Sequence, residues 1–557
     1  MNNLNFIEKI IEDDIQKGFP IHNLKFRFPP EPNGALHLGH VKAIYLNFYL
    51  GQKYQAPVNL RFDDTNPNLY DGHKYVEFIK NDIIFLGFKW DKECYASDYF
   101  QILYELARML IKNDKAYVDN QTQYMIQIQR KNPIEKGINS IFRNRCVEEN
   151  LYLFEKMKNG CFKEGTCVLR AKIDMSSSNM NMRDPIMYRI LKKKHFRTKN
   201  TWCIYPTYDW THGQCDYIEQ ISHSLCSSEF ENRRPLYNWY LDQIVDKQQK
   251  IKPKQIEFSR LNLQNAITSK REIQKLIDKQ IINSWNDPRI YTISGLRRKG
   301  YTAVGIKKFI QDIGVTKRNN VINISLLELK VRENLKQIAY RVMVIFNPIK
   351  LIIDNYPDNH TEWLYSQNHP DNIEFGFRKI PFSKFIYIEK NDFLEQKTNN
   401  FFRLSINQYV RLKNAYIIKA HSVIKDKIGN IIEIHCLYDP QSKSGTMNNN
   451  KYTNKIKSTL HWVSIAHSIT IETYIYHKLF QLNNKYANLF DQTNINNQSI
   501  EKIIAYAEPI LKNAKIGEHF QFQRIGYFYV VYENNKLIFN QTFPLKKNLK
   551  KINNKKL

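Results

Sequence analysis

The chain has 557 residues, and 83 Lys and Arg against 54 Asp and Glu leave it a formal net charge of +29. A chain this long has room for several domains with large cores, and the charge indicates a polyanionic partner, for which nucleic acid fits best. Eight scattered cysteines without a CxxC pair argue against a zinc site or a disulfide framework. The most apolar stretch, 342–353, is interrupted by polar residues, so we expect no membrane partner, no signal peptide and a cytoplasmic location.

The first informative segment lies between a predicted strand and a predicted helix. Residues 24–28 alternate as a strand that ends at prolines, and apolar residues recur at helical spacing over 41–51. His37 and His40 then lie in the first turn of the helix, where free backbone N–H groups and the helix dipole attract anions. Gly39 between them would let a phosphate or a flat adenine approach the backbone.

A pair of histidines with this spacing is more often a helix cap and a packed ring than a binding site. A second basic element far downstream, residues 267–271 (Ile-Thr-Ser-Lys-Arg), makes the functional interpretation stronger. Phosphoryl chemistry without a P-loop needs such a second cation, because the charge on the reacting phosphate must be stabilised from more than one side.

Two carboxylates follow the next predicted strand. Residues 58–62 form an apolar run that ends in Asp63 and Asp64. If the strand is parallel, both carboxylates lie at its carboxyl end, where open α/β sheets bind ligands.

These segments resemble the HIGH and KMSKS signatures of the class I aminoacyl-tRNA synthetases. The chain is most similar to the glutaminyl family of that class, from about Ile7 to about Thr542. Longer matching stretches carry the resemblance, and they lie at 27–34, 59–67, 169–174, 292–298 and 410–416.

The resemblance implies an α/β fold with a Rossmann-type catalytic domain, an inserted acceptor-stem-binding domain, a helical subdomain and two β-barrels that bind the anticodon. The expected borders are 1–97 and 208–260 for the two halves of the catalytic domain, 98–207 for the insertion, 261–340 for the KMSKS-like loop and helical subdomain, 341–545 for the barrels and 546–557 for a basic tail. From the residue pattern, the catalytic sheet resumes near 202–206 and continues to 255–259. Period-two runs at 409–418 and around the Gly429-Asn430 turn predict hairpins.

The resemblance also assigns roles to individual residues. The catalytic candidates are His37, His40, Ser269 and Lys270. The ATP-binding candidates are Glu31, Pro32, Asn33, His37, Gly39, His40, Arg260, Leu261, Thr268, Ser269 and Lys270. The candidates for binding glutamine are Arg27, Asp63, Tyr208, Cys226, Phe230 and Gln255. The candidates for binding tRNA are Asn232, Arg341, Arg403, Lys413, Gln521 and Arg524.

Within the amino-acid set, Asp63 is expected to pair with the α-ammonium. Arg27, Tyr208 and a water held partly by Gln255 are expected to read the side-chain amide. Three of these residues also have an interpretation without a binding role. Tyr208 could be a core aromatic, Gln255 a solvated strand residue and Arg27 a surface cation.

Four positions depart from the family pattern. Thr268 replaces a methionine of KMSKS, and Asn232 stands where an aspartate near the acceptor stem is usual. Lys413 and Gln523 replace arginine and glutamate in the anticodon region. Lysine lacks the bidentate fork of arginine, so Lys413 is expected to hold phosphate without reading a base.

The implied activity is ATP-dependent ligation of glutamine to its cognate tRNA through a glutaminyl-adenylate, with Mg²⁺ on the nucleotide and no metal held by protein side chains. We expect a monomer that must bind tRNA before it activates glutamine. A glutamyl-tRNA synthetase of the β-barrel type is the nearest alternative. Cys226 argues against it, because glutamyl enzymes usually carry an arginine there and a neutral cysteine offers no countercharge to a γ-carboxylate. A non-catalytic tRNA-binding paralogue is the alternative from another class.

Overall fold

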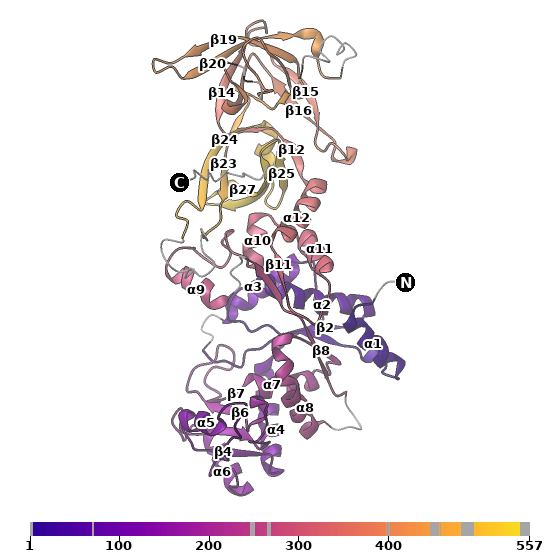
Figure 1. The fold of residues 1–557 in the computed structure, drawn as a ribbon, viewed down its shortest axis with the longest axis vertical. Coiled ribbons are helices and arrows are strands. Elements are labelled where there is room, and N and C mark those ends of the chain that lie inside the picture. Colours follow the sequence, from indigo (N-terminus) through magenta and orange to yellow (C-terminus); the bar gives the residue numbers. More distant parts are fainter. Residues whose placement is uncertain are drawn as a thin grey trace. The chain divides into compact units, whose positions relative to one another are not determined.

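A computed structural model describes residues 4–68, 72–245, 251–264, 269–396, 398, 401–445, 456, 458–480 and 495–545. The chain divides into two compact units (Figure 1). Unit 1 comprises Met1–Trp285, Tyr291–Ser294 and Ile306–Leu327, and unit 2 comprises Asn286–Ile290, Gly295–Gly305 and Glu328–Leu557. Thr268 and the basic tail 546–557 lie outside the described residues. Of the helices that are described, none combines the length and the hydropathy that crossing a bilayer requires.

The centre of unit 1 is a parallel sheet assembled from two separate parts of the chain. Strands β1 (Phe26–Phe28), β2 (Val58–Phe62) and β3 (Lys92–Tyr95) pair in parallel, as do β8 (His223–Ser227) and β9 (Lys254–Phe258). The Ser222 N–H donates to the Lys25 carbonyl, which sets β8 beside β1. The resulting strand order is β3-β2-β1-β8-β9. Successive strands are added to one side of β1 in the first part of the chain and to the other side in the second part, so the order of connection reverses between β1 and β8. A ligand crevice is expected at that point, outside the carboxyl ends of the strands.

Both faces of the central strands are buried, since every residue of β1 and β2 is buried. Helix α2 begins beside this sheet because His37 caps its first turn, and it runs three residues beyond the predicted end at 51. The helices that belong to the catalytic part of unit 1 are α1 (Phe6–Gln16), α2 (Leu38–Tyr54), α3 (Gly72–Phe85), α7 (Tyr208–Ile218) and α8 (Arg234–Ile244).

A second sheet in unit 1 is antiparallel and is formed by the chain between β3 and β8. Its strands pair in the order β4 (Ala116–Asp119), β5 (Val168–Ala171), β6 (Ile186–Ile190) and β7 (Ile204–Pro206). With helices α4 (Phe100–Lys112), α5 (Gln123–Arg130) and α6 (Val147–Lys158), these strands lie within the segment 98–207 predicted as an insertion.

The predicted resumption of the catalytic sheet near 202–206 is wrong. Strand β7 pairs antiparallel with β6, with Tyr188 opposite Pro206, and Trp202 packs into the core of the inserted sheet. A three-residue strand carries no pattern that identifies its partner, so the error could not be seen in the sequence.

Residues 261–340 are mainly helical, as predicted. The helices are α9 (Lys270–Asp278), α10 (Ile293–Lys299), α11 (Ala303–Ile313) and α12 (Ser325–Ile338). A short parallel pair of strands, β10 (Leu261–Gln264) and β11 (Asn320–Asn323), was not predicted.

Unit 2 contains two seven-stranded sheets, and both predicted hairpins are present. Strands β18 (Tyr409–Leu412), β19 (Ile417–Lys425) and β20 (Ile431–Asp439) pair antiparallel in chain order. The sheet around them has the order β21 (Thr459–Leu460), β18, β19, β20, β14 (Pro348–Ile353), β17 (Phe385–Glu389) and β22 (Val463–Ser464). The other sheet has the order β12 (Tyr340–Val342), β25 (His519–Phe522), β26 (Gly526–Glu533), β27 (Lys536–Pro544), β23 (Ile469–Tyr476), β24 (Ile500–Ala507) and β13 (Val344–Ile345).

Each of these sheets closes into a barrel through one short segment of chain. Strands β12 and β13 are opposite edges of one sheet but are separated in sequence by Met343 alone. Strands β21 and β22 are the edges of the other sheet and are separated by His461 and Trp462. Because one segment supplies both edges, the sheet must curl until the edges meet. A separate hairpin, β15 (Glu362–Gln367) and β16 (Phe377–Phe382), completes unit 2.

Candidate active site

The first turn of α2 presents two neutral imidazoles. The Gly39 N–H donates to His37 Nδ1 over 3.1 Å, and the His37 N–H donates to His40 Nδ1 over 3.1 Å. Burial lowers the pKa of His37 to about 3, with help from Lys270 and Arg260, and burial also lowers the pKa of His40. A neutral ring that accepts at Nδ1 must carry its proton on Nε2. Both rings therefore offer an Nε2–H donor at a helix N-terminus.

Gly39 has a packing role that was not predicted, and the close approach of a phosphate or adenine stays a prediction. A Cβ built there would lie 2.8 Å from the Cε1 and Nδ1 atoms of His37. The missing side chain thus makes room for the His37 ring, which packs against His40 with centroids 3.8 Å apart and ring planes 40° apart. A residue larger than glycine would push the first imidazole out of place.

Lys270 lies beside the same turn although it is far away in sequence. Its Nζ contacts Asn33 Oδ1 and lies 3.4 Å from the Glu31 carbonyl oxygen. Burial lowers the pKa of Lys270 to about 8, and the ammonium forms no ion pair within 4 Å among the described residues. An ammonium without a carboxylate partner is prepared to receive an anion.

The other candidates for ATP binding surround this group. Ser269 is the N-cap of α9, and Pro32 is buried between Glu31 and Asn33. Leu261 begins β10, and its carbonyl oxygen lies 4.0 Å from the position of a Cβ on Gly39. Arg260 pairs with Glu229 over 2.9 Å at an exposed position.

Asp63 and Asp64 lie at the end of β2, as predicted, but only Asp63 is available to a ligand. Asp64 is fully buried and accepts hydrogen bonds from the N–H and hydroxyl of Ser97. In the described part of the chain, Asp63 accepts hydrogen bonds from Thr65 and has no cation within 4 Å. Burial raises the pKa of Asp63, and an incoming ammonium would oppose that shift.

A concave site lies among α7, α8, β9 and the 3₁₀ segment Ser228–Arg233 that joins β8 to α8. The residues that line it are Tyr208, Asp209, His212, Phe230, Arg233, Leu236, Tyr237 and Gln255.

The hydrogen bonds of His212 determine whether the Tyr208 hydroxyl acts as a donor or as an acceptor. Arg27 can only donate, so its contact of 2.7 Å to His212 Nε2 makes that nitrogen an acceptor. Burial lowers the pKa of His212 to about 3, and the neutral ring then carries its proton on Nδ1, 3.3 Å from the Tyr208 oxygen. The Tyr208 oxygen accepts a hydrogen bond from this N–H, which leaves its own O–H free to donate to a ligand.

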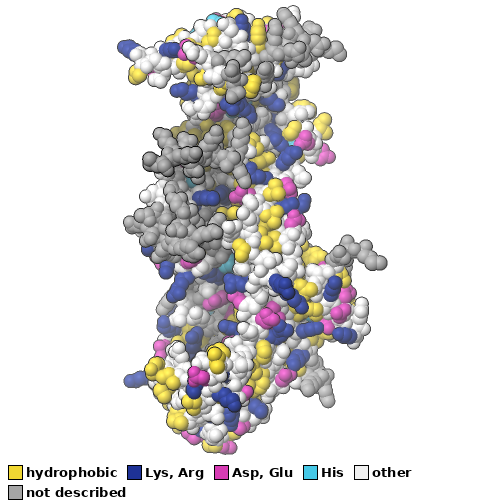
Figure 2. All heavy atoms as spheres, in the orientation of Figure 1, with side chains coloured by type: hydrophobic (Ala, Val, Ile, Leu, Met, Phe, Trp, Pro, Cys, Tyr) yellow, Lys and Arg dark blue, Asp and Glu magenta, His cyan; other side chains and the backbone are white. Residues whose placement is uncertain are grey.

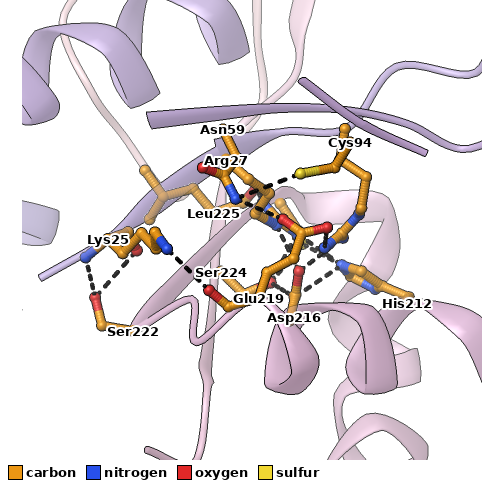
Figure 3. Close-up of polar contacts among 12 residues, drawn as sticks. Lys25, Arg27, Asn59, Cys94, His212, Asp216, Glu219, Ser222, Ser224 and Leu225 are labelled. Carbon is orange, nitrogen blue, oxygen red and sulfur yellow. Dashed lines mark hydrogen bonds and ion pairs between the residues drawn. The ribbon is translucent and has the colours of Figure 1, made fainter. Parts of the chain in front are cut away.

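Arg27 is not the surface cation that sequence alone allowed, since it is 0% exposed. Its Nε donates to Asp216 over 2.9 Å, and its Nη atoms donate to Ser224 and to the Leu225 carbonyl (Figure 3). Asp216 also pairs with Arg61 over 2.7 Å, and Arg61 lies 3.4 Å from Glu219. The network holds two guanidinium groups and two carboxylates, so its net charge is zero.

This network changes the argument made from Cys226. A guanidinium nitrogen of Arg27 lies 3.6 Å from Cys226 Sγ, so a positive group is present near the thiol after all. Asp216 neutralises it, and these two guanidinium groups hold the pKa of the Asp216 carboxyl well below its usual value despite burial. Arg233 is neutralised in the same way by Asp209 at 2.7 Å. Paired charges therefore leave the pocket neutral.

The remaining pocket candidates have specific partners. Phe230 packs against the Tyr208 ring with centroids 5.4 Å apart. Gln255 is 6% exposed, which removes the solvated alternative, and its amide N–H groups donate to Glu257 and to the Phe230 carbonyl. Its carbonyl oxygen is the polar atom that remains for a ligand or a water.

Sequence reasoning missed His212 and Asp216, which connect Tyr208 to Arg27. The three residues lie four apart along α7, so they share one face of the helix. A polar i, i+4, i+8 series along one helix is the signal that could have identified them.

The candidates for tRNA binding form two clusters in unit 2. Arg341 and Gln521 are register partners in β12 and β25, and Arg341 Nε and Gln521 Oε1 are buried without a hydrogen-bond partner in the described structure. Arg403 and Arg524 both pair with Asp392, whose side chain is 1% exposed. Lys413 lies apart from both clusters, exposed in the turn that joins β18 to β19.

Asn232, the tRNA candidate of unit 1, is exposed at the end of a 3₁₀ helix. Its carbonyl oxygen accepts hydrogen bonds from the Asn179 and Asn181 side chains. Figure 2 shows Lys and Arg spread over the visible face rather than gathered in one patch. Among the residues that the structure describes, no group of three or more His, Cys, Asp or Glu could hold a metal ion.

Comparison with known proteins agrees with this architecture. The family model "tRNA synthetases class I (E and Q), catalytic domain" matches residues 23–337, and two models of the anti-codon binding domain of the same class match residues 339–439 and 459–531. A solved glutamate tRNA ligase from Elizabethkingia meningosepticum aligns at 17% identity with a TM-score of 0.42, and the alignment covers 57% of this chain and 70% of that ligase.

Curated relatives match along the full length. A glutamine–tRNA ligase of Clostridium kluyveri is 45% identical over 100% of this chain and 99% of its own, and one of Cronobacter sakazakii is 46% identical over 98% of each. The chain therefore belongs to the class I tRNA synthetases of the E and Q type, among the glutamine–tRNA ligases.

Proposed function

We propose that this protein ligates glutamine to the 3′-terminal ribose of its cognate tRNA at the expense of ATP. In the first step a carboxylate oxygen of glutamine attacks the α-phosphorus of ATP and the bond to pyrophosphate breaks. In the second step a ribose hydroxyl of the terminal adenosine attacks the carbonyl carbon of the adenylate, and AMP leaves. The observation that carries the proposal is a neutral side-chain pocket beside an unpaired carboxylate and an unpaired ammonium.

The contacts support a division of labour in the first step. Asp63, which lacks a cationic partner, holds the α-ammonium of glutamine. The Nε2–H groups of His37 and His40 donate to phosphate oxygens, and Lys270 stabilises the charge that develops on them. Mg²⁺ carried by the nucleotide phosphates would supply further neutralisation.

The charge balance of the pocket supports glutamine rather than glutamate as the substrate. Arg27, Arg61 and Arg233 are all paired with carboxylates. A γ-carboxylate would enter without a countercharge and lose its hydration, which costs several kcal/mol relative to an amide. The Tyr208 hydroxyl donates to the amide carbonyl, and the Gln255 carbonyl accepts from the amide nitrogen directly or through water.

The pairing of Arg341 with Gln521 supports anticodon recognition in unit 2. The two residues are register partners on neighbouring strands, and a guanidinium beside an amide offers donors and an acceptor that suit the edge of a base. Arg403 and Arg524 are paired with Asp392 and are better placed to contact phosphate. Arg341→Ala should weaken discrimination between matched and altered anticodons by about 1–3 kcal/mol.

Parallel aminoacylation of the cognate tRNA with glutamine and with glutamate tests the proposal. We expect glutaminylation to exceed glutamylation by orders of magnitude, and we expect pyrophosphate exchange to be negligible when tRNA is omitted. Preferential use of glutamate would identify a glutamyl enzyme. Tight tRNA binding with no exchange under any condition would identify a binding protein without catalysis.

A further inference from the structure

His195 is a buried histidine to which the proposed function assigns no role. It lies between β6 and β7, in the segment 98–207, and is 0% exposed. Its backbone exchanges hydrogen bonds with Lys199 over 2.9 and 3.0 Å, which closes a short loop. Its ring packs against Phe100 and Tyr205, whose ring centroids lie 5.8 and 6.0 Å away. A ring held in this way has defined partners for both of its nitrogen atoms.

The hydrogen bonds of His195 determine which of its nitrogen atoms carries the proton. Its Nδ1 accepts from the backbone N–H groups of Arg197 and Thr198 over 3.2 and 3.1 Å. Burial lowers the pKa of His195, and in the neutral ring a nitrogen that accepts cannot also carry the proton. The proton is therefore on Nε2, which lies 2.7 Å from the main-chain carbonyl oxygen of Asp64. His195 donates this hydrogen bond to the end of β2, although the two residues are 131 positions apart in the sequence.

The carbonyl that accepts this hydrogen bond belongs to the peptide group between Asp64 and Thr65. The N–H of the same peptide group donates to the carboxylate of Asp63, and the Thr65 hydroxyl donates to it as well, over 3.1 Å. A peptide group is planar, so a bond that fixes its carbonyl also fixes the direction of its N–H. His195 therefore holds one end of a rigid group whose other end orients Asp63.

The side chain of Asp64 anchors the same turn to a second place. Its carboxyl group accepts from the N–H and the hydroxyl of Ser97 over 2.8 and 2.6 Å. Arg197 in turn donates to the Ser97 hydroxyl over 2.6 Å, so the loop that carries His195 also supports this anchor. These bonds hold the Asp64 side chain, whereas the bond from His195 acts directly on the peptide group that orients Asp63.

We propose that His195 is a positioning residue for the activation of glutamine. It orients the peptide group between Asp64 and Thr65, and through it the Asp63 carboxylate that holds the α-ammonium. The segment 98–207 thereby contributes to the amino-acid site, although none of its residues lines the pocket. The inference rests on the proposed function, because that function assigns the α-ammonium to Asp63. The alternative is that His195 only stabilises the fold, and it predicts different kinetics.

Two substitutions of His195 separate its two kinds of hydrogen bond. In His195→Asn the side-chain oxygen can replace Nδ1 as the acceptor of the loop N–H groups, but the side chain is too short to reach the Asp64 carbonyl. In His195→Gln the longer amide places a donor near the position of Nε2. In aminoacylation by the full chain, His195→Asn should raise the KM for glutamine about tenfold, whereas the KM values for ATP and tRNA should stay within about twofold. His195→Gln should bring the KM for glutamine back to within about threefold of the wild type.

An analogue without the ammonium tests whether the effect passes through Asp63. Glutaramate is glutamine with its amino group replaced by hydrogen, so its inhibition constant against glutamine measures binding to which Asp63 does not contribute. His195→Asn should change this inhibition constant by less than about twofold. His223→Asn is the matched control, because His223 is another buried histidine of unit 1, bonded to Ser222 and Asp14, and its loss should leave the KM for glutamine unchanged.

Two outcomes would overturn the proposal. If His195→Asn weakens glutaramate as much as glutamine, or raises the KM for ATP by the same factor, His195 has only a structural role. If His195→Asn leaves the KM for glutamine unchanged, the bond to the Asp64 carbonyl does not position Asp63. Failure of the proposed function would appear in the wild type, which would then not charge tRNA with glutamine.

Discussion

Unit 1 contains two groups of candidate residues with different charge arrangements. We call the group around His37, His40 and Lys270 the cradle, and the concave site beside Tyr208 and Gln255 the pocket. In the cradle, the Lys270 ammonium lies near two neutral imidazoles, Asn33 and the Glu31 carboxyl group, but no carboxylate lies within 4 Å of it among the described residues. In the pocket, Arg27 and Arg61 are buried but are both paired with Asp216. An excess of positive charge prepares a site for a polyanion, whereas balanced charge prepares one for a neutral polar group.

The difference also shows what each site asks of the surrounding structure. A paired guanidinium that is 0% exposed can orient neighbours such as His212 without attracting a carboxylate ligand. The Lys270 ammonium is buried without a close carboxylate. Burial makes the charged form less favourable, and the pKa of Lys270 is therefore lowered.

The largest effect is expected from breaking the balance of the pocket. Asp216→Asn leaves Arg27 and Arg61 buried without their shared countercharge and should lower the free energy of unfolding by about 3–5 kcal/mol. Urea unfolding followed by tryptophan fluorescence measures this. Asp209→Asn is the matched control, because its pair with Arg233 is 27% and 42% exposed and is worth at most about 1 kcal/mol. Equal losses in the two variants would refute the special status of the buried network.

The cradle is tested by removing its cation. Lys270→Ala should lower the rate of pyrophosphate exchange by about 10²–10³, with little change in tRNA affinity, because the ammonium acts on the charge that develops at the phosphate. Lys279→Ala, at the other end of α9, is the control. A parallel fall in rate and tRNA affinity would remove the assigned role.

A smaller effect is expected from the polarity of the pocket. Tyr208→Phe removes the donor that the Arg27–His212 contact directs to the ligand and should raise the KM for glutamine about tenfold. Steady-state aminoacylation measures this, with the KM for ATP as the internal control. An unchanged KM for glutamine would show that the hydroxyl faces away from the substrate.

The smallest effect concerns the proton on Lys270. Only the ammonium form stabilises phosphate, and the pKa of about 8 means that this form is lost as the pH rises through 8. The value of kcat/KM for ATP should therefore be flat below about pH 7, about half its plateau at pH 8 and about fourfold below the plateau at pH 8.5. Lys270→Arg should shift the fall to higher pH, and a flat profile up to pH 9.5 in the wild type would contradict the assignment.

The sequence predicted the elements whose pattern is local. The strand at 58–62, the helix that begins near His37 and the hairpin at Gly429-Asn430 each have a period or a turn signal within a short window. The partner of β7 and the pairing of β10 with β11 could not be predicted, because partners distant in sequence leave no trace in a single chain. His212 and Asp216 were missed because their importance lies in contacts with Arg27 on β1, which their regular spacing along α7 does not reveal.

Barrel closure by single short segments has a consequence for synthesis of the chain. The barrel that starts at β14 is complete once residue 464 has emerged, whereas the barrel that starts at β12 needs β27, which ends at Pro544. The residues of one barrel therefore lie in sequence between strands of the other barrel, and this inner segment can fold first on the ribosome. Until β24 and β25 have been synthesised, β13 and β12 lack their pairing partners, and a nascent chain must protect these strands from aggregation.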